Sequence, residues 1–403
     1  MTDNRKPRQL GIFLTGIAIG ILIMAAGIVG FREYESRVRW GGADPNSKII
    51  EIFTLLERHS ILPFDREEML ETMYRGLLIG VGDPYTQYFD TSALESFRER
   101  MDGAYVGIGV LVSLDPDTRA VTVGVAFSGS PASLAGILPG DQIVGVDGID
   151  VSGRTLEEVV GLVRGPENSV TTLTIFRPYE NTRFDVSINR QRVEIPTVFH
   201  NTIYHYGETI GYIRIEGFDR VTLEQFTTAL SELYAAEIDG LIVDVRNNPG
   251  GSLDTVHHIT NMLIPEGIVL YTEDAQGNRI NHYSNATYLG LPLVVLVNER
   301  SASASEVLSG AVRDTQVGTL VGTTTFGKGI VQSLFPLSDG TAIKMTIAKY
   351  FTPAGESIHG TGITPHIIVE MEESLSRRIG NLMLEEDIQL QAALDVIIDK
   401  ILP

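Results

Sequence analysis

Residues 240–251 read "GLIVDVRNNPGG", and this stretch indicates what kind of fold the chain adopts. It opens with a continuous apolar run, without alternation between apolar and polar positions, and a second such run, "LPLVVLV", occupies residues 291–297. Continuous apolar runs are typical of strands that are buried on both faces, as in parallel sheets. Helical patterns alternate with these runs, so we expect a largely parallel sheet covered by helices.

The remainder of residues 191–372 fits the same α/β layering. "TIGYIRI" at residues 209–215 predicts another strand, and the pattern after it predicts a helix that opens with a capping box between Thr222 and Gln225. Residues 373–403 end the chain with the amphipathic pattern "EEDIQLQAALDVIIDKI". We therefore predict an α/β core followed by a C-terminal helical segment.

Residues 44–100 have the pattern of a helical region. The runs "SKIIEIFTLLERHSILP" and "REEMLETMYRGLLIGVGDP" carry apolar residues at helical spacing, and they end at Pro63 and at residues 82–84. The segment "DPYTQYFD", which follows, contributes three aromatic residues.

Between residues 101 and 190 the sequence changes to short β-type runs separated by turns, such as "AVTVGVAF" and "DQIVGVDGIDV". Two short helices interrupt these runs. One begins at Ser130, a good cap, which is followed by a proline that suits the first turn. The other begins at Thr155, where Glu158 completes a capping box. This pattern predicts a small, self-contained, β-rich module.

The N-terminus contains a long apolar segment. After Arg5, Lys6 and Arg8, residues 10–31 carry no charge, and as a helix they would extend for about 33 Å, enough to cross the core of a bilayer. The basic residues favour a cytoplasmic location for residues 1–9 and export of the body, to the periplasm or the cell surface. A signal peptide that is cleaved is the alternative, because "MAAG" offers small residues.

Composition excludes several classes of function. The chain contains 31 Lys and Arg against 51 Asp and Glu, a net charge of −20, so we expect no nucleic-acid partner. The absence of cysteine excludes a thiol protease. No HExxH pattern occurs, and His257 and His258 are adjacent on a predicted helix, so their side chains diverge. We expect neither a metal ion nor another cofactor.

The stretch "SASASE" at residues 301–306 places three serines on alternate positions, between a predicted buried strand and a predicted helix. A serine at such a junction lies at a helix N-terminus, where unpaired amides and the helix dipole can stabilise a developing oxyanion. A serine hydroxyl is a poor nucleophile without a base beside it. Helix capping is the alternative role of these serines.

A candidate base is Lys328, in the run "TFGKGIVQ", which lies between two glycines and before Ile330 and Val331. A lysine acts as a base near neutral pH only when its pKa falls from about 10.4 toward 7, a change of about 4–5 kcal/mol. Desolvation among apolar neighbours can supply this shift. Gln332 could orient the amine without raising its pKa as a carboxylate would. The alternative is an ordinary solvated lysine.

The loop "DVRNNPGG" at residues 244–251 directly follows the buried strand. Its proline and two glycines suit a strand-to-helix turn, and they also leave backbone amides free to bind an anion. Taken alone, the stretch leaves both roles open.

Together these stretches resemble the carboxy-terminal processing peptidases, which are tail-specific serine proteases with a Ser–Lys dyad. "SASASE", "FGKGIVQ" and "DVRNNPGG" match the motifs of that family in order and spacing. "DPYTQYF" matches the segment ahead of the family's PDZ domain, and "YVGIGV" with "AGILPGDQIVGVDG" resembles the PDZ domain itself. The resemblance covers about residues 83–370 and implies a PDZ module and a ClpP/crotonase-like α/β core.

The resemblance also implies roles for individual residues. Ser303 would be the nucleophile and Lys328 the general base, and Gln332 would position the lysine. Three further groups are implied: an oxyanion hole formed by Ala304 with Gly250 and Gly251, supporting residues Glu306, Asp244 and Arg246, and a carboxylate-binding PDZ loop formed by Val106, Gly107, Ile108, Gly109 and Val110. Ile330 and His366 stand where the family usually has threonine and aspartate.

We therefore predict an α/β multi-domain, membrane-anchored serine endopeptidase that recognises protein C-termini and cleaves nearby bonds through an acyl-enzyme. Its predicted parts are residues 1–9 (cytoplasmic N-terminus), 10–31 (transmembrane signal-anchor), 44–100 (N-terminal helical region), 101–190 (PDZ domain), 191–372 (serine protease core) and 373–403 (C-terminal helical segment). Expected partners are protein or peptide substrates and the membrane, and a homo-oligomer or an activating partner stays open. The alternatives are an inactive PDZ scaffold that binds C-termini and an acyl-CoA hydratase or isomerase.

Overall fold

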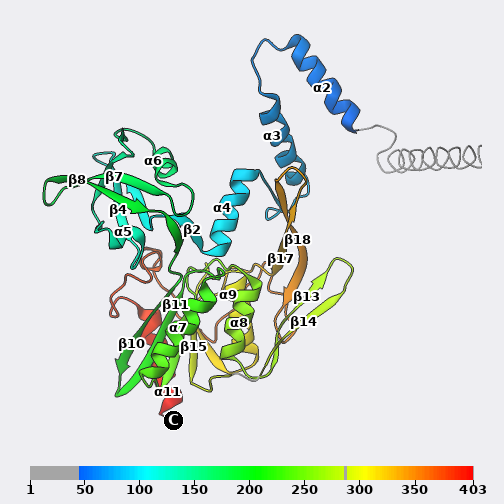
Figure 1. Ribbon diagram of the computed structural model, residues 1–403. Helices are drawn as coiled ribbons and strands as arrows, with labels where there is room; N and C mark the ends of the chain where they lie inside the picture. The colour runs from blue at the N-terminus through cyan, green and yellow to red at the C-terminus, as the bar shows by residue number, and fades with distance from the viewer. Residues whose placement is uncertain (1–44, 286–287, 403) are drawn as a thin grey trace, which may run out of the picture. The chain divides into compact units, whose positions relative to one another are not determined.

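The computed structural model describes residues 45–285 and 288–402 (Figure 1). The chain divides into two compact units, Met1–Met73 and Tyr74–Pro403. The first contains helix α2 (Pro45–His59) and the start of helix α3 (Arg66–Ile79), as the apolar spacing predicted. The predicted cytoplasmic segment and signal-anchor lie outside the described residues, and among the helices that are described none is long and apolar enough to span a membrane.

A mostly parallel sheet forms the centre of the second unit, with the strand order β10-β11-β12-β15-β16-β19. Only β10 runs antiparallel to its neighbour in this sheet. The strands are β10 (Val198–His205), β11 (Glu208–Ile215), β12 (Gly240–Asp244), β15 (Leu293–Val297), β16 (Gly318–Gly322) and β19 (Ile367–Ile368). The two apolar runs are the adjacent strands β12 and β15, which confirms the predicted parallel α/β core.

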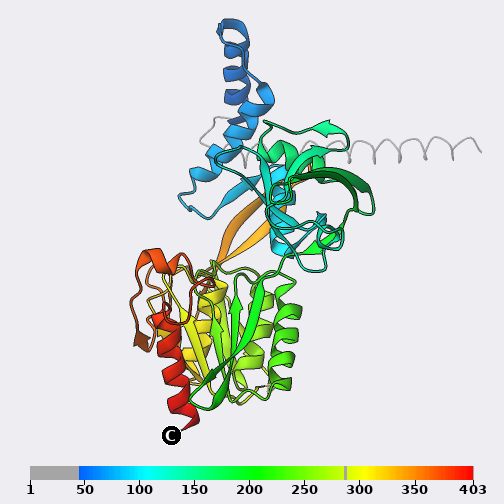
Figure 2. The ribbon, with the colours of Figure 1, turned by 90° about the vertical axis from the view of Figure 1, so that its left-hand side faces the viewer.

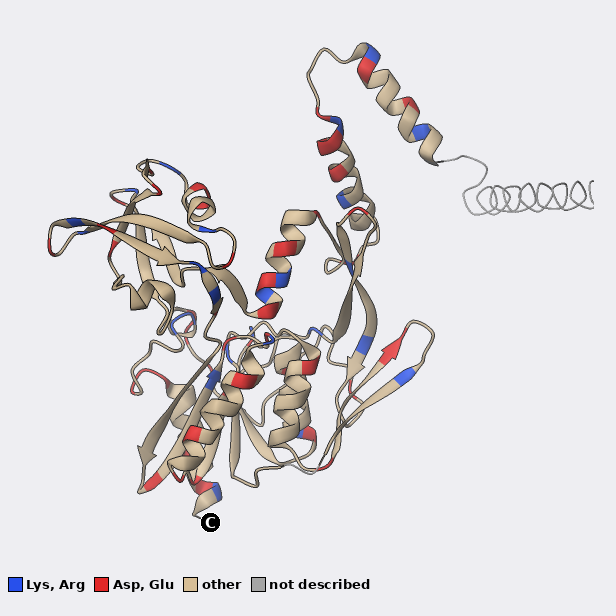
Figure 3. Cartoon of the chain, in the orientation of Figure 1, with Lys and Arg blue, Asp and Glu red and all other residues tan. Residues whose placement is uncertain are grey.

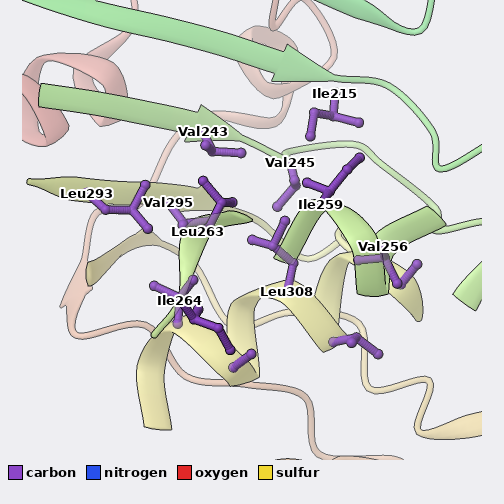
Figure 4. Close-up of a cluster of buried hydrophobic side chains, with 14 of the residues drawn as sticks. Ile215, Val243, Val245, Val256, Ile259, Leu263, Ile264, Leu293, Val295 and Leu308 are labelled. Atoms are coloured by element: carbon purple, nitrogen blue, oxygen red, sulfur yellow. The ribbon is translucent and has the colours of Figure 1, made fainter. Parts of the chain in front are cut away.

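Helices cover both faces of this sheet, and Figure 2 shows the strands between α11 on one side and α7 and α8 on the other. Val294 belongs to the apolar cluster on the α11 side, whereas Val295 belongs to the cluster with α7, α8 and α9. Figure 4 shows Ile259 and Leu308 in that second cluster. Burying each such side chain contributes about 1.5–3 kcal/mol, so both faces stabilise the sheet. The helices are α7 (Thr222–Ala235), α8 (Leu253–Leu263), α9 (Ala304–Asp314) and α11 (Ile388–Ile401).

The capping box predicted for α7 is wrong. The residue before the helix is Val221, and no side chain caps the helix there. The Thr222 hydroxyl instead donates to the Gly217 carbonyl at 3.0 Å, and the Gln225 carbonyl oxygen accepts from the Thr197 amide at 2.8 Å. Both side chains therefore satisfy buried backbone groups around the helix rather than the helix itself.

The β-rich module has its own sheet, with the strand order β3-β4-β5-β7-β8, and its own apolar core. The predicted capping box of α6 is confirmed, because the Thr155 amide donates to Glu158 at 2.8 Å and the Glu158 amide donates to Thr155 at 3.3 Å. The elements are β2 (Ala104–Gly107), β3 (Val110–Leu114), β4 (Val121–Ala126), α5 (Pro131–Leu134), β5 (Gln142–Val146), β6 (Ile149–Asp150), α6 (Leu156–Val163), β7 (Val170–Arg177), β8 (Thr182–Asn189) and β9 (Gln191–Glu194).

A further antiparallel sheet carries the lysine stretch, with the strand order β1-β18-β13-β14 and β17 paired to β18 (Figure 1). Residues 44–100 were expected to be a helical region, but part of the segment "DPYTQYFD" within them forms β1, which pairs with β18 through Gln87 and Lys344. The remaining elements are β1 (Gln87–Phe89), α4 (Thr91–Asp102), β13 (Gly267–Asp274), β14 (Arg279–Ser284), β17 (Ile330–Pro336), β18 (Ala342–Phe351) and α10 (Glu373–Ser376).

Candidate active site

The three serines of the "SASASE" stretch have different surroundings. Ser301 and Ser305 are fully buried, and their hydroxyls donate to the carbonyls of Val245 and Asn248 at 2.8 and 2.9 Å. Ser303 is half-buried and lines a cleft of about 730 Å³. The middle serine is therefore the one that reaches a space large enough for a peptide, and its neighbours hold the start of α9 against the loop after β12.

Ser303 adopts a backbone conformation that residues other than glycine rarely adopt. Its φ is 54° and its ψ is −110°, and such a conformation costs about 1–3 kcal/mol. Two hydrogen bonds hold this backbone in place: the Tyr350 hydroxyl donates to the Ser303 carbonyl at 2.9 Å, and the Ser303 amide donates to Glu306 at 2.8 Å. Strain that is held in this way is typical of a functional position.

The buried carboxylate of Glu306 joins the serine stretch to the lysine stretch. Its Oε1 accepts from the Thr325 hydroxyl at 2.6 Å and from the Gly327 amide at 2.7 Å. Its Oε2 accepts from the amides of Lys328 and Ser303, each at 2.8 Å. The backbones of the two candidate catalytic residues are thus bound to the same oxygen atom.

Lys328 is half-buried and lines the same cleft as Ser303. Its Nζ donates to Gln332 Oε1 at 3.2 Å and lies 4.8 Å from the centre of the Tyr85 ring. Gln332 Nε2 donates to the Tyr85 carbonyl at 2.6 Å, so the amide oxygen is the end that faces the lysine. Burial lowers the pKa of Lys328 below its ordinary value, although Asp83 and Glu306 act in the opposite direction. Such a lysine is suited to accept a proton.

Asp83 holds the Tyr85 segment in position, a role that the sequence pattern did not reveal. Its carboxylate accepts from the Tyr85 amide at 3.0 Å, from the Thr86 hydroxyl at 2.6 Å and, across to β18, from the Thr346 hydroxyl at 2.7 Å. Burial tends to raise the pKa of Asp83, but these hydrogen bonds outweigh it and hold the pKa below its ordinary value. The segment ahead of the β-rich module thereby supports Gln332 and Lys328.

The three amides expected in the oxyanion hole are not equivalent. The Gly250 amide already donates to Asn248 Oδ1 at 2.8 Å, so the expectation that it serves as an oxyanion donor does not fit this geometry. The amides of Gly251 and Ala304 form no hydrogen bond within the part of the chain that the structure describes, and both residues line the cleft.

Gly250 instead allows a close approach between the loop and the serine turn. Its φ is 103°, and a Cβ at this position would lie 2.9 Å from Ser303 Cβ and 3.0 Å from the Ala304 nitrogen. Glycine is therefore required here for both reasons.

Asp244 and Arg246, which were expected to have supporting roles, do not line the cleft. Both are buried, and the Arg246 guanidinium donates to Asp244 at 2.7 Å and to Asp387 at 2.8 Å. It also donates to Gln389 at 3.1 Å. Arg246 thus fastens the start of α11 to the carboxyl end of β12.

A second hollow, an apolar groove of about 440 Å³, lies on the β-rich module between β3 and α6. Of the expected carboxylate-binding loop, Gly107, Ile108 and Val110 line this groove, whereas Val106 and Gly109 do not. Gly109 has a φ of 82° and forms the turn into β3.

One side of this groove is formed by residues that the sequence reasoning missed. Tyr105 lines it, and the Arg164 guanidinium lies 5.8 Å from the centre of the Tyr105 ring and 3.0 Å from Glu99 on α4. No local pattern indicated that α4, which precedes the module, contributes to its groove.

The α/β core and the β-rich module both match known proteins in sequence. Peptidase family S41 matches residues 209–369, and the PDZ domain matches residues 123–177. The carboxyl-terminal-processing protease of Synechocystis sp. is 35% identical over 345 residues, which cover 85% of this chain and 80% of that protein. The carboxy-terminal processing protease CtpB of Bacillus subtilis is 34% identical over 345 residues, which cover 85% of this chain and 71% of that protein. A solved structure of an S41 protease from Bacteroides fragilis is 18% identical, covers 85% of this chain and 93% of that chain, and shares the fold with a TM-score of 0.52.

Proposed function

Because the chain belongs to the carboxyl-terminal processing proteases of peptidase family S41, we propose that it cleaves proteins near their C-termini with Ser303 as nucleophile and Lys328 as base. As a member it is a serine endopeptidase that carries a PDZ domain. The observation that supports these roles best is the Glu306 carboxylate, which binds the amides of both residues beside the cleft that they line.

In the proposed first step, the neutral amine of Lys328 accepts the hydroxyl proton of Ser303 while the hydroxyl oxygen attacks the carbonyl carbon of the scissile bond. Gln332 accepts one N–H of the amine, which leaves the lone pair of the nitrogen for the proton. The oxyanion that forms would be stabilised by the amides of Gly251 and Ala304, the second at the N-terminus of α9.

Collapse of this intermediate breaks the peptide bond. The Lys328 ammonium donates its proton to the leaving amine, which departs with the C-terminal fragment, and an ester remains on Ser303. In the second step Lys328 accepts a proton from a water molecule that attacks the ester carbonyl, and it returns this proton to the Ser303 oxygen as the bond between that oxygen and the carbonyl carbon breaks. The products are the shortened substrate, with a new carboxylate, and the free serine.

The apolar groove of the PDZ domain would bind the substrate C-terminus. β3 is the edge strand of its sheet, so an extended peptide can add to it by backbone hydrogen bonds. The groove is lined by Ile108, Val110 and other apolar residues, which favours apolar residues at the substrate C-terminus. Because the loop at residues 106–110 is expected to bind the terminal carboxylate, amidation of that terminus should slow cleavage of a protein substrate.

For the remaining parts, the proposal follows the sequence. Residues 10–31 would anchor the enzyme in a membrane, with its catalytic part outside the cytoplasm, unless they are removed as a signal peptide. Accessibility of the catalytic part to added protease in intact cells would check this orientation.

Cleavage assays with the full chain test the catalytic roles. An unfolded protein with an apolar C-terminus would be incubated with wild type, Ser303→Ala and Lys328→Ala, and the products analysed by mass spectrometry. Matched controls are Ser231→Ala and Lys349→Ala, at exposed positions on α7 and β18. We expect cleavage to be lost in the first two variants, with unchanged circular dichroism, and kept in the controls. Cleavage by Ser303→Ala would refute the assignment, and no cleavage by wild type would favour the scaffold alternative.

A further inference from the structure

A second lysine lines the active-site cleft. Lys344 on β18 is half-buried, and its ammonium lies 5.6 and 5.4 Å from the ring centres of Phe89 and Phe97. No carboxylate forms an ion pair with it among the residues that the structure describes. The two rings attract the charge but accept none of the three N–H bonds of the ammonium in the way an oxygen would.

The charges around Lys344 destabilise its ammonium, so a bound anion would stabilise it. Burial and the nearby charges of Lys328 and Arg100 lower the pKa of Lys344, and Asp83 alone acts in the opposite direction. The Asp83 oxygens already accept three hydrogen bonds. A half-buried ammonium that other cations repel gains more from a carboxylate ligand than a solvated one does.

In the described part of the chain, neither carboxylate that lines the cleft forms an ion pair with Lys344. Asp102 on α4 is paired with Arg220 at 2.8 Å, and Asp254 belongs to α8. Helix α4 also contributes Arg98 to the cleft, and Figure 3 shows basic and acidic residues alternating along this helix. The residues that line the cleft thus include four cations, Arg98, Arg220, Lys328 and Lys344, against two carboxylates, Asp102 and Asp254, within a chain whose net charge is −20.

The strand register places Lys344 close to the catalytic lysine. In the β17–β18 pair, Gln332 lies opposite Thr346 and Leu334 lies opposite Lys344. Residues two apart on a strand share a face and are about 7 Å apart, so Lys344 lies one such step from Thr346, the residue opposite Gln332, and Gln332 binds Lys328. An extended substrate covers that distance in about two residues.

We propose that Lys344 is a specificity residue, whose ammonium binds a carboxylate of the peptide substrate within about four residues of the scissile bond. The inference rests on the proposed function, since it concerns a peptide held for attack by Ser303. Two sources offer the same chemistry, an Asp or Glu side chain and the free C-terminus of a short tail.

Matched peptides test the proposal with the full-length enzyme. One set of internally quenched peptides differs only by Glu or Gln at each of the four positions on either side of the scissile bond. Rates are measured on the plateau of the pH profile, where kcat/KM no longer changes with pH. We expect wild type to prefer Glu at one position by about tenfold in kcat/KM, chiefly through KM, which corresponds to about 1.4 kcal/mol.

The variants Lys344→Met and Lys344→Gln should lower the Glu-to-Gln ratio to about 1, with a larger loss on the Glu peptides than on the Gln peptides. Lys344→Arg should keep part of the preference. Lys349→Met is the matched control, because Lys349 is on the same strand, is exposed and does not line the cleft. It should keep the full ratio.

A second peptide set, with tails of one to four residues that end in a free or an amidated C-terminus, identifies the source of the carboxylate. A free-acid preference that Lys344→Met abolishes supports the proposal with the chain terminus as ligand. Equal losses on Glu and Gln peptides, or ratios that the variants leave unchanged in both sets, would overturn it. Failure of the proposed function is distinguishable, because Ser303→Ala would then cleave these peptides or wild type would cleave none.

Discussion

Ser303 is held in an unfavourable backbone conformation by contacts from its own helix and from distant parts of the chain. Glu306 binds its amide and Tyr350 its carbonyl, while the absence of a side chain at Gly250 allows the neighbouring loop to approach. The side chains around Ser303 thus maintain the strain, and Ser303 is the one serine of its stretch that lines the cleft.

Replacing Glu306 by Gln should therefore affect catalysis and stability together. A glutamine amide has one acceptor oxygen, whereas the carboxylate accepts four hydrogen bonds. We expect the free energy of unfolding to fall by about 2–4 kcal/mol and kcat/KM to fall by about 100-fold or more. Urea denaturation and peptide cleavage measure the two effects, with Glu224→Gln, exposed on α7, as the control. A variant with wild-type kcat/KM would show that the four hydrogen bonds of the Glu306 carboxylate are dispensable for catalysis.

The pH dependence of cleavage should report on Lys328. A base acts in its neutral form, so kcat/KM should fall as the pH drops through the lowered pKa of Lys328 and level off above it. Asp83 raises that pKa, so Asp83→Asn should move the acidic limb of the profile to lower pH, even if the maximal rate also falls. Profiles of kcat/KM against pH for both proteins provide the measurement. A limb that moves to higher pH would contradict the assignment of Lys328 as base.

The proposed catalytic serine and lysine were predicted from the sequence only through the family resemblance, because local patterns left capping and surface roles open. The structure gives the physical reason for the choice of Ser303, which is the burial of Ser301 and Ser305. Residues that act through tertiary contact, such as Asp83 and Tyr350, carry no local pattern that would have revealed them.

Among the helices and strands, prediction succeeded where burial on one or both faces leaves a periodic pattern. β12 and β15 are apolar at nearly every position because helices cover both sheet faces. The capping box of α6 was predicted correctly, but the same pattern at α7 failed, because buried backbone groups nearby bind the Thr222 and Gln225 side chains. Tertiary demand overrode a local preference there.

The loop that leads into α7 carries a carboxyl group in an unfavourable place. Burial raises the pKa of Asp219 from 3.8 to about 6. A raised pKa favours the folded state below pH 3.8, and that contribution is lost as the pH rises through about 6, so the ionised carboxylate destabilises the fold at pH 7.5. Asp219→Asn should raise the free energy of unfolding by about 1 kcal/mol at pH 7.5, allowing for screening by solvent. Near pH 3.5 it should leave the free energy of unfolding unchanged.

Urea denaturation at the two pH values tests this expectation. Asp399→Asn, at an exposed position on α11, is the control and should change little at either pH. An equal gain for Asp219→Asn at both pH values would show that burial of the charge is not the cause.

The protein as a whole depends on contacts between segments that are far apart in sequence. The hydrogen bond from Gln332 to the Tyr85 carbonyl joins positions 247 residues apart, and it brings the segment ahead of the PDZ domain close to Lys328, the proposed base. The order of the domains could be predicted from texture and motifs, but such pairings could not, because periodicity reports only which face of an element is buried.

Docking of the C-terminal helix is one such long-range contact, and it can be tested by removing one partner. Asp387 caps α11 and pairs with buried Arg246 at 2.8 Å. Asp387→Ala would leave part of that guanidinium without its acceptor. We therefore expect the free energy of unfolding to fall by about 3–5 kcal/mol and amide hydrogen exchange in α11 to become faster. Asp399→Ala on the same helix should have little effect. A loss below about 1 kcal/mol would mean that the pair is not needed for docking.

Cleavage of one peptide by Ser303→Ala, Lys328→Ala and the double variant shows whether the two residues form a catalytic dyad. If they act as one unit, each single substitution should lower kcat/KM by about 10³-fold or more, and the double variant should be no worse than either. Losses that multiply in the double variant, or activity of Lys328→Ala within tenfold of wild type, would show that the serine depends on another base.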